Sequence, residues 1–93
     1  MPPERLDTAR HAAYELAPDL LLVSKPQGHR EGEHTHGYAL RLRVVRGRLA
    51  VQMGAREAIL DDPQRPYTIA AGTPHATRAI EPTWVIVERI GGD

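Results

Sequence analysis

The sequence predicts an all-β fold: a small antiparallel jelly-roll barrel formed by a single domain of residues 1–93. Apolar and polar side chains alternate with the two-residue period of a β-strand over most of the chain after Asp19. The chain also contains eight glycines and eight prolines, which provide frequent turns. Together these features indicate about seven or eight short, closely spaced strands, as in a sandwich or closed barrel.

The N-terminal region is the only candidate for a helix. Its apolar residues recur at near-helical intervals: Leu6, Ala9, Ala13 and Leu16. Pro18 would end such a helix. We therefore expect residues 3–16 to form a short helix, or else an extended arm that packs on the barrel. The barrel itself is expected to cover about residues 19–90.

The first predicted strands come directly after this region of the chain. Residues 20–23 are a short apolar run between Pro18 and Pro26, which indicates a buried strand. Residues 34–44 then alternate strictly and predict one long strand. Its inward face would carry His34, His36, Tyr38, Leu40, Leu42 and Val44. Its outward, basic face would carry Thr35, Ala39, Arg41 and Arg43.

The second half of the chain continues this pattern. Arg46-Gly47 is typical of a hairpin turn. Further strands are predicted over residues 49–53, 57–60, 67–71 and 84–90. The third of these leads into the turn Gly72-Thr73-Pro74, which delivers His75.

Composition excludes several classes of function. The 12 basic and 12 acidic side chains balance, so we expect no nucleic-acid or membrane partner. A net charge near zero favours self-association, here as a homodimer. The absence of cysteine excludes disulfides, thiolate metal ligands and a cysteine nucleophile. No signal peptide and no membrane span is recognisable, and a cytoplasmic location is expected.

Three histidines carry the strongest functional signal. His34 and His36 lie two residues apart on a predicted strand, where such side chains share a face. His75 comes from a distant turn and would complete a site only through the fold. Neutral imidazoles that converge in this way bind divalent metal ions. A surface His-x-His pair would look the same in the sequence, and His75 is what favours the metal interpretation.

Around these histidines the chain resembles the cupin superfamily. The first cupin motif is a Gly, five residues, His-x-His, three or four residues, a Glu, six residues and a Gly. The matching residues here are Gly28, His34, His36 and Gly47. Leu40 stands at the position of the Glu, which in the family is usually a fourth metal ligand.

The second cupin motif, Pro-x-Gly-x-x-His followed by Asn, is matched at Gly72 and His75. Ala70 replaces the Pro and Ala79 replaces the Asn. The resemblance extends over about residues 19–90. The segments around residues 67–75 and 85–88 also resemble the short cupins related to tellurite-resistance proteins.

The resemblance implies a three-histidine metal site formed by His34, His36 and His75. Three neutral ligands leave the charge of a divalent ion uncompensated, which favours a small anionic substrate. Zinc, iron, nickel, copper and manganese all remain open. Two functions remain open as well: a metal-dependent enzyme, such as an oxygenase or isomerase, or a non-catalytic sensor that binds a small ligand without turnover.

Two residues are candidates for catalytic roles. Tyr38 shares the inward face with His36 and, like Leu40, is expected to line the pocket, where its hydroxyl would reach a substrate. Glu88 would act as a base if its face of the last strand lines the cavity. Otherwise Glu88 is a charge on an edge strand that discourages aggregation.

Charged and polar residues just before the histidine pair have smaller expected roles. His29 is the reserve metal ligand, because a loop could turn it inward. Glu31 and Glu33 have the opposite parity to His34, so both are expected to face solvent.

Overall fold

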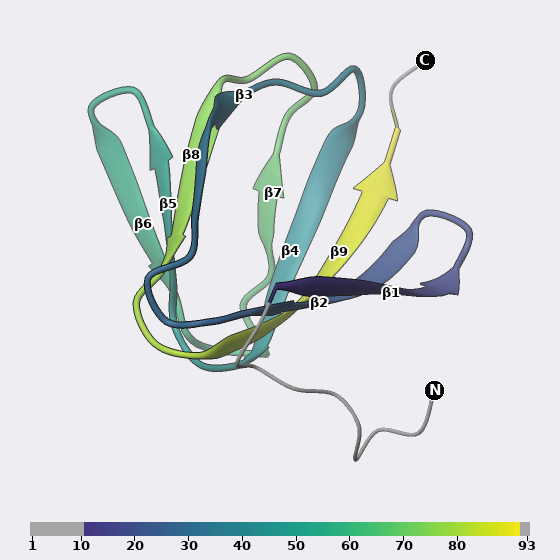
Figure 1. Ribbon diagram of the computed structural model, residues 1–93. Helices are drawn as coiled ribbons and strands as arrows, with labels where there is room; N and C mark the ends of the chain where they lie inside the picture. Colours follow the sequence, from purple (N-terminus) through teal and green to yellow (C-terminus); the bar gives the residue numbers. More distant parts are fainter. Residues whose placement is uncertain (1–10, 92–93) are drawn as a thin grey trace.

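The chain forms two antiparallel β-sheets that face each other (Figure 1). The computed structural model describes residues 11–91, which contain nine strands. One sheet has the order β1-β2-β9-β4-β7, formed by Ala12–Ala17, Leu20–Lys25, Thr83–Ile90, Ala39–Arg46 and Tyr67–Ile69. The other has the order β3-β8-β5-β6, formed by Arg30–His34, His75–Ala79, Leu49–Met53 and Arg56–Leu60. The predicted all-β jelly roll is confirmed.

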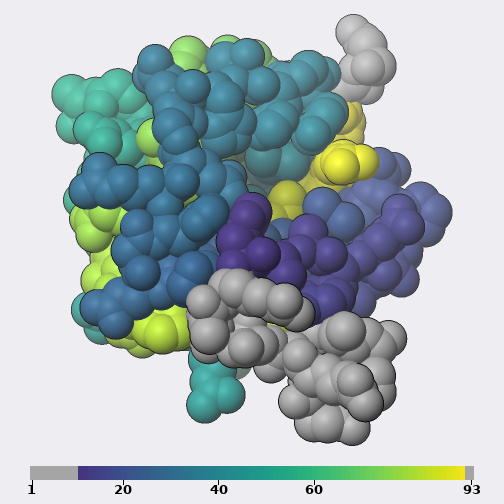
Figure 2. Space-filling view, viewed as in Figure 1, coloured from purple at the N-terminus to yellow at the C-terminus, as the bar shows by residue number. Residues whose placement is uncertain are grey.

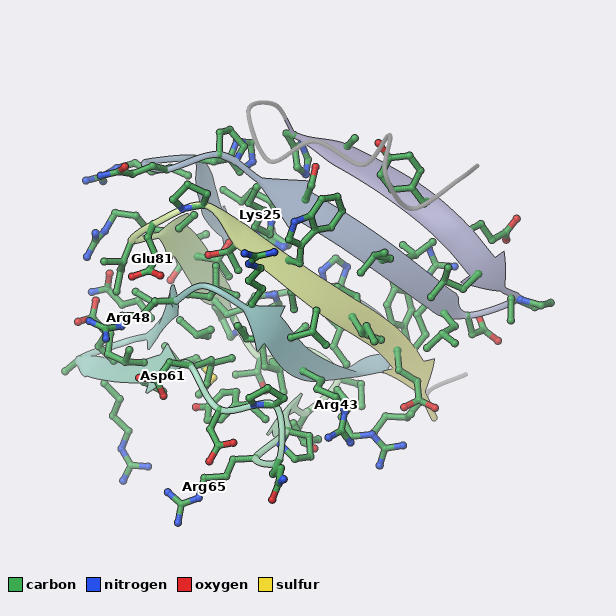
Figure 3. The ribbon with its side chains drawn as sticks, turned by 90° about the horizontal axis from the view of Figure 1, so that it is seen from below. Lys25, Arg43, Arg48, Asp61, Arg65 and Glu81 are labelled. Atoms are coloured by element: carbon green, nitrogen blue, oxygen red, sulfur yellow. The ribbon has the colours of Figure 1, made fainter. Side chains whose placement is uncertain are left out.

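The core lies between the two sheets. Val44, Ile69 and Val85 reach it from the larger sheet, and Leu49 and Val51 from the smaller one; each is at most 2% exposed. Alternation places these side chains inward and the charged ones outward, as the sequence predicted for the central strands. On the outside, Arg43 and Arg65 project at the periphery of the molecule (Figure 3).

The predicted N-terminal helix is wrong over the residues that the structure describes. Residues 12–17 form strand β1, which pairs antiparallel with β2, Ala12 lying opposite Ser24. Sheet pairing satisfies the backbone of this segment, which outweighs its weak helical spacing. The alternative of an extended arm is therefore confirmed here, and the barrel starts earlier than residue 19. Residues 3–10 lie outside the described part of the chain.

The single long strand predicted over residues 34–44 is also wrong. Strand β3 ends at His34, and β4 begins at Ala39 in the opposite sheet. The intervening residues carry the chain across from one sheet to the other. In the space-filling view, the blue segment around β3 lies beside the purple β1 (Figure 2). Among residues 11–91, no helix is long and apolar enough to span a membrane.

Candidate metal centre

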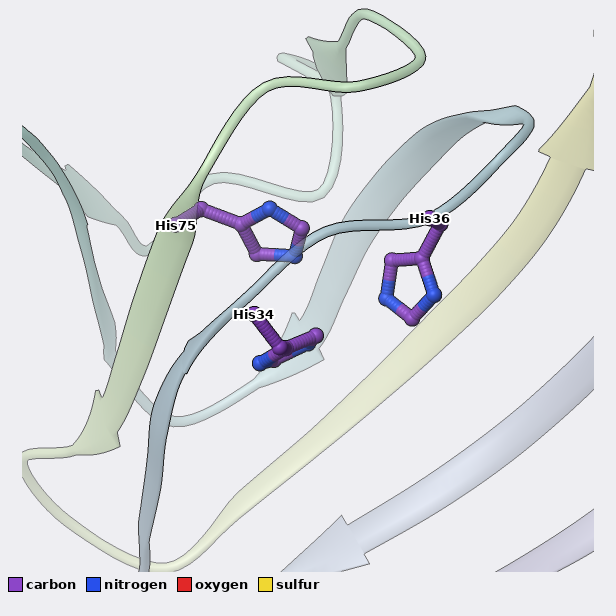
Figure 4. Close-up of side chains that lie close together, drawn as sticks. All are labelled: His34, His36 and His75. Atoms are coloured by element: carbon purple, nitrogen blue, oxygen red, sulfur yellow. The ribbon is translucent and has the colours of Figure 1, made fainter.

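Three imidazoles from two distant parts of the chain meet at one end of the barrel (Figure 4). His34 ends β3, His36 lies in the segment that follows, and His75 begins β8. Their nitrogen ligand atoms all lie within 4.8 Å of one another. His34 and His75 are direct partners in the β3–β8 ladder, with ring centroids 4.4 Å apart. The fold therefore brings together the three predicted ligands.

Backbone carbonyls orient two of the three rings. The Nδ1 atom of His34 lies 2.6 Å from the carbonyl oxygen of Gly32, and the Nδ1 atom of His75 lies 2.8 Å from that of Thr73. Because a carbonyl oxygen only accepts, each Nδ1 carries the proton and donates it. The lone pair is then on Nε2 in both rings. Carbonyl partners of this kind are typical of histidines that bind metals.

The third ring is held by stacking. The His36 ring lies nearly parallel to that of Tyr38, with centroids 5.1 Å apart. The pKa of His36 lies below its ordinary value of 6.5, first because of burial and then because of the positive charges of its histidine neighbours and Arg89. His36 is therefore neutral at pH 7, as a metal ligand must be.

The histidines open onto a cavity of about 270 Å³ between the two sheets. Its walls are mainly apolar, formed by Leu21, Val23, Leu40, Leu42, Leu49, Val85 and Val87. Tyr38 and Leu40 are among the residues that line it, and Leu40 is 7% exposed. An apolar cavity with a few converging polar groups is typical of a small-molecule site.

Glu31 is placed differently from the prediction. It lines the cavity, although 33% of its side chain is still exposed. The reason is a register shift in β3: Glu31 pairs with Thr77 and His34 with His75, so three steps on β3 match two on β8. Such a bulge resets the parity of a strand, so both Glu31 and His34 point inward. Glu33 is exposed, as expected.

Glu31 balances a buried cation that the sequence reading missed. The Nζ atom of Lys25 lies 2.8 Å from Oε2 of Glu31, and Lys25 is only 5% exposed. Burial alone would raise the pKa of the Glu31 carboxyl, but the hydrogen bond and charge of Lys25, helped by two histidines, hold it below its ordinary value of 4.5. The sequence did contain a signal for this burial. Lys25 lies in an apolar strand and has the same strand parity as Leu21 and Val23, so its side chain falls on their face.

We expect Glu31→Gln to lower the free energy of unfolding by about 1–3 kcal/mol at pH 7, because the Lys25 ammonium loses its counter-charge. Since folding lowers this pKa, the stabilisation is present above pH 4.5 and fades as the pH falls below that value. Urea unfolding at several pH values measures the difference. Glu33→Gln is the matched control at an exposed site; an equal effect there would contradict the role given to Glu31.

The reserve ligand His29 does not join the three histidines. Its ring stacks on that of His11, with centroids 4.2 Å apart, and its Nε2 lies 3.3 Å from Oε2 of Glu31. These three residues form a second group with metal-ligand spacing. Lys25 already supplies a cation to the same carboxylate oxygen, so we interpret this group as an ion-pair cluster.

Glu88, the second catalytic candidate, points away from the cavity. Its Oε1 accepts hydrogen bonds from Nε and Nη2 of Arg41 at 3.0 and 2.7 Å. Its strand, β9, lies between β2 and β4 and is not an edge strand. Glu88 is therefore one half of an ion pair across neighbouring strands on the outer face.

The opposite face of β9 brings Arg89 to the cavity instead. The Cζ atom of Arg89 lies 5.4 Å from the centre of the Tyr38 ring, within the range of a cation–π contact. Nη1 of Arg89 lies 3.8 Å from Oδ1 of Asp19. The sequence contained a signal for this placement, because Arg89 has the same strand parity as Val85 and Val87.

Two facing antiparallel sheets bring together histidines from β3, the segment after it and β8. Neither a family model nor a curated protein matches the chain by sequence. Solved structures do match. A cupin superfamily protein from Desulfitobacterium hafniense superposes with a TM-score of 0.72 at 13% identity, over 88% of this chain and 77% of that one. The chain thus has the fold of the cupin superfamily.

Two further similar structures belong to proteins whose names state an activity or a role. One is the DMSP lyase DddQ from Ruegeria pomeroyi, with a TM-score of 0.75 and 24% identity over 94% of this chain and 51% of that one. The other is the cupin domain of an XRE family transcriptional regulator from Enterobacter cloacae, with a TM-score of 0.74 and 18% identity over 89% and 98%. The resemblance to cupins related to tellurite resistance is not shown by these comparisons.

Proposed function

We propose that this chain is a metal-binding cupin that holds a divalent ion on His34, His36 and His75 and acts on a small anionic molecule. The observation that carries the proposal is the orientation of the rings. Backbone carbonyls accept hydrogen bonds from the Nδ1–H groups of His34 and His75 and leave both Nε2 lone pairs for a ligand.

The charges around the cavity support an anionic ligand. Imidazoles supply no negative charge, and the family's acidic ligand is replaced by the buried Leu40. Arg89 adds a cation at the same cavity. A divalent ion held there would supply a Lewis acid that polarises a bound oxygen. The apolar walls exclude water around the ligand, which strengthens such interactions.

The test is a calorimetric titration of metal-free protein, first with Zn²⁺ and then with butyrate. We expect about one ion per chain, and at least about tenfold tighter butyrate binding with Zn²⁺ present. Arg89→Met should weaken butyrate binding about five- to tenfold, because a charge-assisted contact is lost. Arg43→Met, on the outer face, should leave it unchanged. No uptake of Zn²⁺, or butyrate binding that ignores it, would refute the proposal.

A non-catalytic sensor is the second candidate. One observation favours it: Glu88, the carboxylate considered as a base, is engaged by Arg41 outside the cavity. A structurally similar domain belongs to a transcriptional regulator, and a shared fold is compatible with either role. Turnover assays with thiols, keto acids and sugars separate the two, because a sensor gains thermal stability from its ligand and yields no product.

A further inference from the structure

We propose that the inner face of the larger sheet, where it borders the cavity, is a subsite for an apolar tail, so that the small anion is a carboxylic acid with a saturated hydrocarbon chain. This inference rests on the proposed function, because the carboxylate of that acid would be held between the histidines and Arg89. It names the substrate class of the same site.

The first observation is an apolar face that the protein covers at one end and leaves open at the other. Leu21 and Val87 lie opposite each other on β2 and β9 and line the cavity, where both are only partly buried. The next inward pair on these strands, Val23 and Val85, is 6% and 0% exposed. Apolar surface left open inside a cavity is stabilised when another apolar group covers it.

The open part of this face continues across three strands. Leu42 on β4 lies opposite Val87 on β9, and Val87 lies opposite Leu21 on β2. All three side chains line the cavity. Because neighbouring strands are about 4.8 Å apart, this row of apolar side chains is roughly 10 Å long. A row of this shape can bind an extended hydrocarbon tail along its length.

The groups that would hold the carboxylate border this row. Arg89 follows Val87 by two residues on the same face and lies opposite Leu40 of β4. The guanidinium of Arg89 contacts the ring of Tyr38, and that ring stacks on His36. An acid held by its carboxylate between His36 and Arg89 would therefore lay its tail along the apolar row.

The remaining charges of the cavity do not favour a polar tail. Lys25 and Glu31 also line the cavity, but the Nζ atom of Lys25 lies 2.8 Å from Oε2 of Glu31. This pair is neutral as a whole. A charged or hydroxylated tail would give up its water for leucine and valine side chains, which costs free energy. A saturated tail meets no such cost.

The size of the cavity limits the length of the chain. The cavity measures about 270 Å³. A water molecule takes about 30 Å³ in the liquid, so there is room for roughly nine non-hydrogen atoms. With two of them in the carboxylate, the acid would have about six or seven carbons. We therefore expect affinity to rise with chain length up to hexanoate and then to level off.

The experiment is calorimetry of the Zn²⁺-loaded protein with acetate, butyrate, hexanoate and decanoate. Each methylene added up to hexanoate should tighten binding about two- to fourfold, as expected for the burial of a methylene. Decanoate should bind no more tightly than hexanoate. A flat series, or a rise that continues unchanged to decanoate, would overturn the proposal.

Two adjacent leucines give the matched variants. Leu21→Ser should reduce the preference for hexanoate over acetate about five- to tenfold and leave the affinity for acetate unchanged. Leu22→Ser is the control, because Leu22 is also half-buried but lies on the outer face of β2, opposite Ile86. It should keep the preference. Loss of the preference in Leu22→Ser alone would place the tail on the outer face and refute the subsite.

A second variant keeps the test decisive if Leu21→Ser fails to fold. Leu21→Phe retains an apolar wall but narrows the cavity, so hexanoate should no longer bind more tightly than butyrate. An unchanged series in this variant would contradict the subsite. Zn²⁺ uptake is measured separately. Uptake with Zn²⁺-dependent butyrate binding but no effect of chain length refutes the subsite alone, whereas no uptake refutes the proposed function and the subsite with it.

Discussion

Replacing His75 with Ala is expected to reduce the affinity for a divalent ion at least about a hundredfold, or about 2.8 kcal/mol. His75 is the most buried of the three histidines, at 3% exposed, and its ring is fixed by the carbonyl of Thr73. The two remaining imidazoles come from neighbouring positions of one segment and cannot enclose an ion between the sheets. Calorimetry with Zn²⁺ measures the loss directly.

Thermal unfolding gives an independent measure of the same effect. An ion at a hundred times its dissociation constant stabilises the folded chain by about 2.7 kcal/mol, which for a domain of this size raises the Tm by roughly 10–20 °C. His75→Ala should abolish this rise. His29→Ala, which alters a histidine outside the three, should keep it. If His75→Ala retained the rise, the ion would be bound elsewhere.

The strand pattern of the sequence was sufficient to predict an all-β fold. Alternation in β4 reports burial on one face, and this signal is local. The meeting of His75 with His34 was predicted through the cupin resemblance, because no local rule relates residues so distant in the chain. The sheet pairing of β3 with β8 supplies that contact.

Two local features could not be read from alternation alone. The bulge between Glu31 and His34 depends on the partner strand, so parity within β3 gave the wrong side for Glu31. In β9 both faces carry large apolar residues, such as Trp84 and Val85. The sequence therefore did not decide between Glu88 and Arg89 as the residue at the cavity. The homodimer and the cytoplasmic location stay predictions.

Gly47→Ala is expected to lower the free energy of unfolding by about 3 kcal/mol, the largest effect on stability that we anticipate. Gly47 has a φ of +95°, a backbone conformation that costs other residues about 1–2 kcal/mol. A methyl group there would also lie 2.7 Å from both Cα and Oγ1 of Thr83. Overpacking of this kind adds about 1–3 kcal/mol.

Thr83 has little room to move. It is fully buried, and its Oγ1 lies 3.1 Å from both the amide nitrogen and the carbonyl oxygen of Arg48. Gly54→Ala is the matched control, because Gly54 has a φ of +60° but no atom within 4 Å of the added carbon. It should cost only about 1–2 kcal/mol in urea unfolding. Equal losses for the two variants would mean that backbone conformation alone, and not the approach to β9, requires glycine at the end of the first cupin motif.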